Sequence, residues 1–381
     1  IYALLLSFTV SFLVSKLVIY RFGDQIKYMD AAVGGRKIHT ETVPRVGGLA
    51  IYFGVVLSVL ILFYQEITFL NWGWFLFGFS FIFGLGFLDD LIEISWKIKL
   101  GGQLGIAGFL VYWLSTQIEA ITFFGHLFPI NWFVFAPIFV FWFVGIVNSI
   151  NLIDGMDGLA GGSIIILAVG AIFISGFSQD SISIYIHLSF LGALMAFLKF
   201  NRNPALYFMG DGGSMSLGFY AAVLPLIFIN ASQETSIDVT PFILMNSFFI
   251  ADTIRVFWTR IKKGQHPLHP DNLHLHHLLF FKNDSHNGTV LSIYGLVVIS
   301  SFFGVVHMRY GDGLLEFLIY AFLLLCYIFS DTCLNAIVNL FTVMYKNIHH
   351  MFSWFPKKAI NPVVLLLLFF LESTYLLLIT Y

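Results

Sequence analysis

The sequence predicts an all-α polytopic membrane protein. Of its 381 residues, 59% are apolar and only 10% are charged, whereas soluble domains carry about 25% charged residues. The apolar residues form runs close to the ~20 residues that a membrane-spanning helix needs. Aspartates, asparagines, histidines and basic residues gather in the connections between these runs. Together these observations exclude a soluble globular domain.

Eleven runs are long enough to span, and a final run would make a twelfth. We expect about 11 transmembrane helices, at 2–20, 46–64, 72–88, 100–117, 132–148, 158–176, 183–199, 212–229, 239–257, 290–306 and 313–330, and a possible twelfth at 359–380. The basic residues and histidines of 331–358 indicate a surface connection. We therefore expect one membrane domain over 1–330 and a C-terminal extension over 331–381.

Lysine and arginine predict the orientation. They fall in or beside alternate connections, and among the first eleven spans only Arg309 departs from this pattern. The opposite loops, near 65–71, 118–131, 177–182 and 230–238, contain none. Because basic loops stay in the cytoplasm, the N-terminus is expected outside. The outer segment 118–131 can form a small hairpin around Gly125 and Pro129.

Two acidic groups stand at expected membrane boundaries on the cytoplasmic side. Asp89 and Asp90 follow an apolar run, where adjacent carboxylates are costly unless they bind a cation or handle protons. One of them could act as a general base, and the alternative is a hydrated helix end. Lys97 and Lys99 follow closely. They could neutralise the pair, bind a phosphate or contact anionic lipid.

The segment 148–159 mixes amide and carboxylate oxygens with glycines. Its Asn151, Asp154 and Asp157 recur every three residues and suit Mg²⁺, which prefers hard oxygen ligands. The next cytoplasmic segment, 208–214, repeats this composition, and its Asp211 could hold a metal at a helix start that favours anions. The alternative for 148–159 is an Asx-rich turn without a ligand, and the alternative for 208–214 is a capping turn without a ligand.

Two further clusters carry histidines and cations. The segment 266–277 holds five histidines but none of the Cys or Glu residues of recognised zinc spacings, so phosphate binding is favoured over a metal, and structural surface histidines are the third interpretation. Arg36, Lys37 and His39 precede Pro44 and a pair of glycines. This loop could clamp a nucleotide diphosphate or bind a lipid headgroup. Acids for Mg²⁺, cations for phosphates and a membrane that supplies a lipid together indicate phosphoryl transfer.

These motifs, in this order, resemble those of the polyprenyl-phosphate N-acetylhexosamine-1-phosphate transferases, and among them the bacterial undecaprenyl-phosphate GlcNAc-1-phosphate transferase branch. The matching residues are Lys37-x-His39 with Pro44-x-x-Gly47-Gly48, Asp89-Asp90, Asn151-x-x-Asp154-Gly155-x-Asp157-Gly158-Leu159, Pro204-Ala205-x-x-Phe208-Met209-Gly210-Asp211-x-Gly213-Ser214 and Pro270-Asp271-x-x-His274-x-His276-His277. Asn272 departs from the arginine common in this branch. The His-Leu-His-His pattern differs from the three consecutive histidines of the related UDP-MurNAc-pentapeptide transferase.

The resemblance implies a glycosyltransferase family 4 enzyme that joins a UDP-N-acetylhexosamine and undecaprenyl phosphate into undecaprenyl-diphospho-sugar and UMP. Mg²⁺ is the expected cofactor, with Mn²⁺ as a substitute. The implied place is a bacterial inner membrane, with the active site facing the cytoplasm, at the first membrane step of cell-surface polysaccharide synthesis, such as cell wall, lipopolysaccharide or O-antigen. A homodimer is possible, and no nucleic acid is involved.

The resemblance also implies residue roles. Metal ligands would be Asn151 and Asp211, and the groups near the chemistry would be Asp89, Asp90, Asp154, His274, His276 and His277. Substrate contacts would come from Lys37, His39, Lys97, Lys99, Asp157, Phe208 and Asp271, with Phe208 stacking on uracil. Both direct attack by the lipid phosphate and a covalent aspartyl intermediate have been argued for this family, and direct attack needs fewer special groups.

Other functions fit less well. The UDP-MurNAc-pentapeptide transferase is the alternative within the family. A secondary transporter would place ionisable groups near the membrane midplane, whereas here the polar residues lie at helix ends on one face. Asp252, inside the expected span 239–257, is the most transporter-like residue, and it is expected to pair with Arg255. A CDP-alcohol phosphotransferase would require an Asp-Gly-x-x-Ala-Arg motif, which the sequence lacks.

Overall fold

A computed structural model describes most of the first 311 residues. The described ranges are 1–22, 29–30, 43–65, 69–177, 181–232, 235–266, 272–283 and 285–311, with scattered positions between 321 and 343. The expected spans at 313–330 and 359–380 and the connection at 331–358 lie wholly or largely outside these residues.

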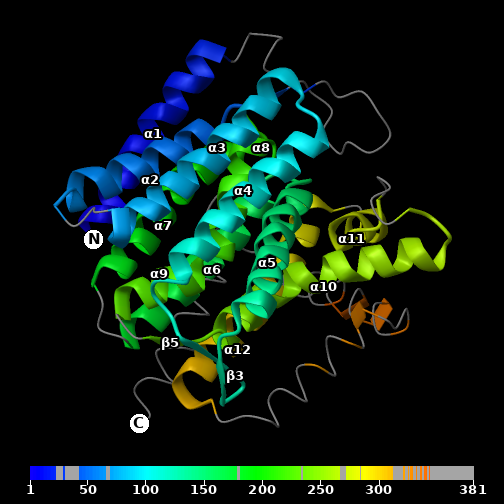
Figure 1. Ribbon diagram of the computed structural model, residues 1–381. Coiled ribbons are helices and arrows are strands. Elements are labelled where there is room, and N and C mark those ends of the chain that lie inside the picture. The colour runs from blue at the N-terminus through cyan, green and yellow to red at the C-terminus, as the bar shows by residue number, and fades with distance from the viewer. Residues whose placement is uncertain are drawn as a thin grey trace.

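Helices dominate the described residues (Figure 1). They are α1 (Tyr2–Phe22), α2 (Gly48–Phe63), α3 (Trp74–Ile92, preceded by the π-helical turn Phe69–Gly73), α4 (Trp96–Leu114), α5 (Trp132–Ile153), α6 (Leu159–Phe177), α7 (Ser181–Asn201), α8 (Gly210–Ala222), α9 (Leu224–Ser232), α10 (Thr240–Lys262), α11 (Leu275–Asn283) and α12 (His286–Tyr310). Each of the ten expected spans that lie within the described ranges therefore contains helix. The short helix α11 was not expected.

The helices confirm a multi-pass membrane protein. Within the described residues, seven are long and apolar enough to cross a membrane, or eight if α8 and α9 form one bent span. The helices in two further expected spans are not among these. Helix α2 has only 16 residues, and α4 carries Lys97 and Lys99 in its first turn. The expected total of eleven or twelve stays a prediction.

The expected span at 212–229 is broken. Its two parts, α8 and α9, meet at an angle of 52°. Pro225 has no N–H to donate to the carbonyl of Ala221. The Asn246 amide of α10 donates to that carbonyl at 3.3 Å, and the Trp142 indole of α5 donates to the carbonyl of Ala222 at 3.0 Å. Because unpaired carbonyls are costly in a membrane, these two side chains stabilise the break.

Short strands correct the all-helical expectation. The expected hairpin at 118–131 forms from β3 (Ala120–Phe123) and β4 (His126–Pro129), and β5 (Ser236–Asp238) pairs in parallel with β3. A second pair joins β1 (Met29–Asp30) to β2 (Val43–Pro44). Figure 1 places β3 and β5 at one end of the helices, while the connection from α3 to α4 lies at the other.

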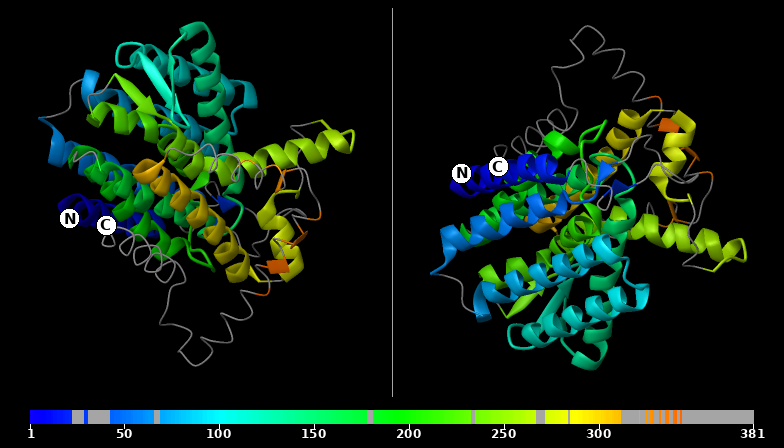
Figure 2. Two further views of the ribbon diagram at one scale, coloured as in Figure 1. Left: turned by 90° about the horizontal axis from the view of Figure 1, so that it is seen from below. Right: turned by 90° about the horizontal axis from the view of Figure 1, so that it is seen from above.

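Small residues let the helices approach closely, as is usual in membrane bundles. On α1, the Ser11 hydroxyl donates to the carbonyl of Ala193 in α7 at 3.0 Å. A Cβ built on Gly48 would lie 2.5 Å from the backbone nitrogen of Gly213, so α2 meets α8 backbone to backbone. The second half of α10 departs from this bundle, and both views in Figure 2 show it extending outward.

The contact between α2 and α8 can be tested by substitution. A methyl group at Gly48 would also lie 2.7 Å from the carbonyl oxygen of Met209, and such overpacking costs about 1–3 kcal/mol. We therefore expect Gly48→Ala to lower the midpoint of thermal unfolding in detergent. Gly105→Ala in α4 is the matched control, because its added methyl meets no atom within 4 Å. Equal midpoints for the two variants would contradict this packing.

Candidate active site

Three helix ends meet at the end of the bundle opposite β3 and β5. Asp89 lies near the C-terminal end of α3, Lys99 lies in the first turn of α4, and Asp211 lies in the first turn of α8. The Lys99 ammonium donates to Asp89 Oδ2 at 2.8 Å and to Asp211 Oδ2 at 2.7 Å. Both carboxylates keep some exposure, 16% and 28% of their side chains respectively. Three residues from separate motifs thus form one partly open charged cluster.

Asp90 has different partners from its neighbour Asp89. Its Oδ1 accepts the backbone N–H of Asp211 at 2.8 Å, and its Oδ2 accepts the N–H of Gly212 at 2.9 Å. The first N–H groups of a helix have no partner within the helix. Asp90 therefore caps α8 from another helix, and both of its oxygens are engaged by backbone.

The segment before α8 is held by the loop before α2. The Phe208 N–H donates to the carbonyl of Pro44, and the Phe208 carbonyl accepts the N–H of Gly47, both at 2.8 Å. Gly210 has φ +68°, and a Cβ there would lie 2.5 Å from Asp90 Oδ2. Only glycine fits this position readily. Two motifs that lie far apart in the sequence are thus joined by backbone hydrogen bonds.

The end of α5 supplies amide and carboxyl groups. Asn151, in the last turn, donates from Nδ2 to the Ser214 hydroxyl of α8 at 2.8 Å and also lies within hydrogen-bonding reach of the Asp211 carboxylate. Asp154 follows at the end of the helix. Desolvation, reinforced by the Asp211 and Asp90 carboxylates, raises the pKa of Asp154 to about 8. A partly buried group of carboxylates of this kind is stabilised by a bound cation.

Asp157 faces a different neighbour. Its Oδ2 accepts from the Asn203 side chain at 2.9 Å and from the Ala205 N–H at 3.1 Å. Sequence reasoning did not assign a role to Asn201, whose side chain accepts the Gly158 N–H at 2.9 Å and donates to the carbonyl of Tyr207 at 2.8 Å. Asn201 therefore links the turn before α6 to the segment before α8. Its position in Asn201-Arg202-Asn203-Pro204 was the available signal.

The histidines extend the site toward α11. A Cβ on Gly155 would lie 2.7 Å from His276 Nε2, so this ring packs against the turn after α5. Burial, helped by His277, lowers the pKa of His276 to about 3, and the ring is neutral at pH 7. His277 stacks on Phe281 with ring centroids 6.2 Å apart. His274 lies at the start of α11 and pairs through Nδ1 with Asp252 Oδ2 at 2.8 Å. The expected pairing of Asp252 with Arg255 is confirmed at 2.8 Å.

The structure does not bring all predicted residues into this cluster. Lys97 is exposed, and its ammonium lies 5.8 Å from the ring centroid of Trp96. Lys37, His39 and Asp271 lie outside the described residues.

The donor atoms of the cluster fit Mg²⁺. Among the described residues, no three His, Cys, Asp or Glu side chains form a metal-binding group by themselves. The cluster offers hard oxygen donors from the carboxylates of Asp211 and Asp89 and from the side-chain carbonyl of Asn151. Mg²⁺ is commonly bound through one or two carboxylates together with water and substrate phosphates. The set therefore fits an ion that a phosphate-bearing substrate would help to hold. Oxygen donors of this kind also suit Mn²⁺.

Comparison with known proteins is consistent with this arrangement. Residues 72–229 match the model of glycosyl transferase family 4. The chain is 33% identical, over 89% of its length and 96% of the relative's, to a probable undecaprenyl-phosphate N-acetylglucosaminyl 1-phosphate transferase of Bacillus subtilis. The chain belongs to glycosyl transferase family 4.

Two differently named transferases are also similar to the chain. An undecaprenyl-phosphate alpha-N-acetylglucosaminyl 1-phosphate transferase of Thermotoga maritima is 30% identical over 68% of this chain and 74% of the relative. A phospho-N-acetylmuramoyl-pentapeptide-transferase of Listeria welshimeri is 30% identical over 72% of this chain and 90% of the relative. The family match spans α3 to α9 and therefore includes Asp89, Asn151 and Asp211.

The two neighbouring aspartates are expected to respond differently to substitution. Asp90→Ala leaves the first N–H groups of α8 without a cap, a loss worth about 0.5–2 kcal/mol, so it should lower the midpoint of thermal unfolding. Asp89→Ala removes one of two acceptors of Lys99, which still pairs with Asp211, so the shift should be smaller. Equal shifts in the two purified variants would contradict the capping role of Asp90.

Proposed function

We propose that the protein transfers a HexNAc-1-phosphate, with GlcNAc-1-phosphate favoured, from a UDP-sugar to undecaprenyl phosphate. The products are undecaprenyl-diphospho-sugar and UMP, in the first membrane step of a cell-surface polysaccharide pathway. The observation that carries this proposal is the bridge from Lys99 to Asp89 and Asp211 at the ends of apolar helices. There, a lipid-borne phosphate and a soluble nucleotide can meet. The names of the Bacillus and Thermotoga relatives support the same substrates.

Asp211 and Asn151 would hold Mg²⁺ on the donor diphosphate. When bound, the ion would neutralise the charge of the phosphate oxygens. Asn151 suits this role because its Nδ2 is directed to Ser214, which leaves its carbonyl oxygen for the cation. Lys99 lies between the carboxylates and would balance charge on the phosphates during transfer.

Asp89 is the better candidate to orient the lipid phosphate, because both oxygens of Asp90 cap α8. An oxygen of the lipid phosphate would attack the phosphorus that bears the sugar. The bond from that phosphorus to the bridging oxygen breaks, and UMP leaves with the electron pair. Attack by the phosphate oxygen itself requires no aspartyl intermediate. In such chemistry the protein acts mainly by positioning groups and stabilising charge.

The remaining residues would bind the donor. Phe208 would stack on uracil, with Asp157 at the nucleoside and Asp154 supporting the metal or the sugar. His274, His276 and His277 would contact the donor phosphates or the sugar. Lys37, His39, Lys97 and Asp271 keep their predicted substrate contacts as part of this proposal.

The proposed location is a bacterial plasma membrane with the site facing the cytoplasm. The alternation of basic and non-basic loops supports this orientation. The charged cluster and the β3–β5 sheet lie at opposite ends of the bundle, as that orientation requires (Figure 1). A homodimer remains a prediction.

Transfer of phospho-MurNAc-pentapeptide is the second candidate, because the Listeria relative carries that name. The two reactions differ only in the donor sugar. Assay of both UDP-sugars with undecaprenyl phosphate therefore distinguishes them. The transporter alternative is less well supported, because Asp252 and Arg255 neutralise one another.

The reaction predicts a strict dependence on both substrates and the ion. Purified protein should release UMP from UDP-GlcNAc only when undecaprenyl phosphate and Mg²⁺ are both present, and chelation with EDTA should stop release. Coupled detection of UMP measures this directly. Release that is indifferent to the lipid would rule out the proposed transfer.

Asp211→Asn tests the metal assignment. The neutral amide loses a charged oxygen at the cation, so turnover should fall at least about hundredfold, a loss typical of removing one preorganised electrostatic group. Asp238→Asn is the matched control, because Asp238 lies in β5 at the other end of the bundle, and it should retain activity. Near-normal turnover by Asp211→Asn, in protein that inserts normally, would overturn the assignment.

A further inference from the structure

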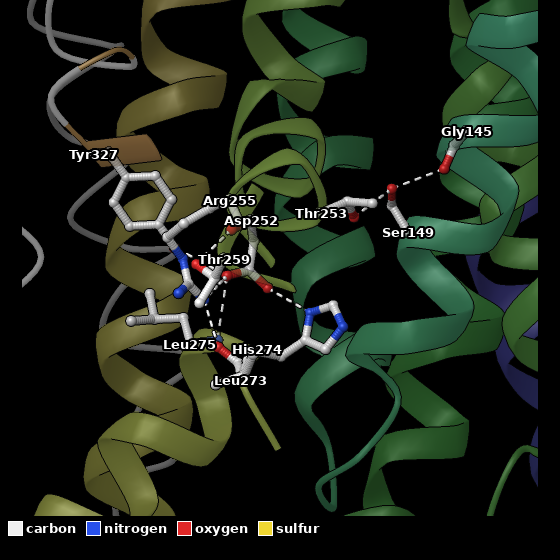
Figure 3. A network of polar contacts seen from close by, with 10 residues as sticks. All are labelled: Gly145, Ser149, Asp252, Thr253, Arg255, Thr259, Leu273, His274, Leu275 and Tyr327. Atoms are coloured by element: carbon white, nitrogen blue, oxygen red, sulfur yellow. Dashed lines mark hydrogen bonds and ion pairs between the residues drawn. The ribbon is translucent and has the colours of Figure 1, made fainter. Parts of the chain in front are cut away.

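A buried polar network surrounds Asp252 in the middle of α10 (Figure 3). Its Oδ1 accepts from Arg255 Nη2 at 2.8 Å, from the Tyr327 hydroxyl at 3.0 Å and from the Leu275 N–H at 3.2 Å. Its Oδ2 faces His274 Nδ1 at 2.8 Å. Asp252, Arg255 and His274 are 4%, 3% and 5% exposed. The carboxylate thus holds a cation and the start of α11 on one oxygen and reserves the other for a single histidine.

The contact with Asp252 determines which ring nitrogen of His274 carries a proton. A carboxylate only accepts hydrogen bonds, so Nδ1 must be the donor. The other nitrogen, Nε2, is buried and has no hydrogen-bond partner among the described residues. Figure 3 shows it turned away from Asp252, on the side of α5. A buried ring nitrogen without a partner is costly, so Nε2 is available to a ligand.

The position of His274 connects this nitrogen with the active site. The His274 and His276 rings stack with centroids 5.9 Å apart and planes 15° apart. His276 in turn packs against Gly155, next to Asp154. The main chain on both sides of His274 is held as well, since Arg255 donates to the carbonyl of Leu273 at 2.6 Å and Asp252 accepts from Leu275. The ring is therefore fixed in both place and orientation.

Neutralising Asp252 does not require His274, because Arg255 already supplies the opposite charge. A structural ion pair would be complete with Arg255, Tyr327 and the Leu275 N–H on Oδ1. The separate use of Oδ2 for His274 resembles the carboxylate that orients a histidine in other enzymes. There it fixes the tautomer and stabilises the imidazolium form.

We propose that Asp252 is a positioning residue that fixes the Nδ1–H tautomer of His274 and directs Nε2 at an anionic oxygen of the phosphate-bearing substrate. The inference rests on the proposed phosphotransferase function and adds a residue to its site. In the charged form of the ring both nitrogens carry a proton, so Nε2 can donate a hydrogen bond to that oxygen while Nδ1 donates to Asp252, whose negative charge offsets the charge of the ring. Asp252 itself does not touch the substrate.

Asp252→Asn is the sharpest test. The asparagine oxygen can still accept from Arg255, Tyr327 and Leu275, so the network on Oδ1 is preserved. Its NH₂ group replaces Oδ2 and can only donate, so it pairs with a neutral His274 that accepts at Nδ1. The Nε2–H group then offers the substrate a neutral hydrogen bond in place of a charge-assisted one. We expect kcat/KM for UDP-GlcNAc to fall about ten- to hundredfold, the range of one charge-assisted hydrogen bond. KM for undecaprenyl phosphate should not change.

Thr253→Val is the matched control. Thr253 follows Asp252 on the same helix and shares a hydrogen bond of 2.8 Å with Ser149 of α5, but it has no contact with His274 (Figure 3). This variant loses a buried interhelical hydrogen bond and should keep wild-type kinetics. Thermal unfolding of both variants in detergent checks that each is folded.

A double-mutant cycle distinguishes positioning from general support of the fold. If Asp252 acts through His274, Asp252→Asn should have no further effect in a His274→Gln background. Equal loss in both backgrounds would overturn the proposal, and so would wild-type kinetics for Asp252→Asn. If His274→Gln turns over too slowly, the same cycle is measured on UDP-GlcNAc binding by calorimetry. A wild-type protein that releases no UMP would contradict the proposed function instead.

Discussion

The arrangement of the site depends on the capping of one helix start. The N-terminal turn of α8 lies where α2, α3 and α4 meet, and its first N–H groups need acceptors from outside the helix. Asp90 provides both, at 2.8 and 2.9 Å, and thereby sets the position of Asp211 relative to Asp89 and Lys99. Glycines at positions 48 and 213 remove the side chains that would keep α2 and α8 apart. The charged cluster is a consequence of this packing.

The opposite wall of the site is organised by a second carboxylate used in a similar way. Asp252 accepts the first N–H of α11, as Asp90 does for α8, and it also holds the ring of His274. In both places an aspartate from a long helix caps a helix that carries proposed ligand-binding groups. The neighbouring Arg255 offsets the cost of burying Asp252, whereas Asp90 is satisfied by two backbone N–H groups. Adjacent acids can therefore serve different purposes: Asp90 caps α8, whereas Asp89 accepts from Lys99.

Much of this could be predicted from local features of the sequence. Apolar runs located the helices, and the short outer segment with Gly125 and Pro129 indicated its hairpin. The family was recognisable because its motifs stand in order at helix ends, and the comparisons confirm it. The break after Val223 was missed, although Pro225 is its cause, because the apolar run continues through it. The parallel pairing of β5 with β3 was also missed, since it joins two loops that carry no matching pattern.

The sequence by itself determined the membrane class, the positions of most helices, the family and the residue types that gather between the spans. Hydropathy, charge and motif order are all written along the chain, so they can be recognised without coordinates. Only the tertiary structure decided which aspartate does what, because the partners are distant: Asp90 caps a helix 121 residues away, and Asp252 holds a histidine 22 residues away. Identical carboxyl groups differ only in the donors that surround them, and folding alone brings those donors together.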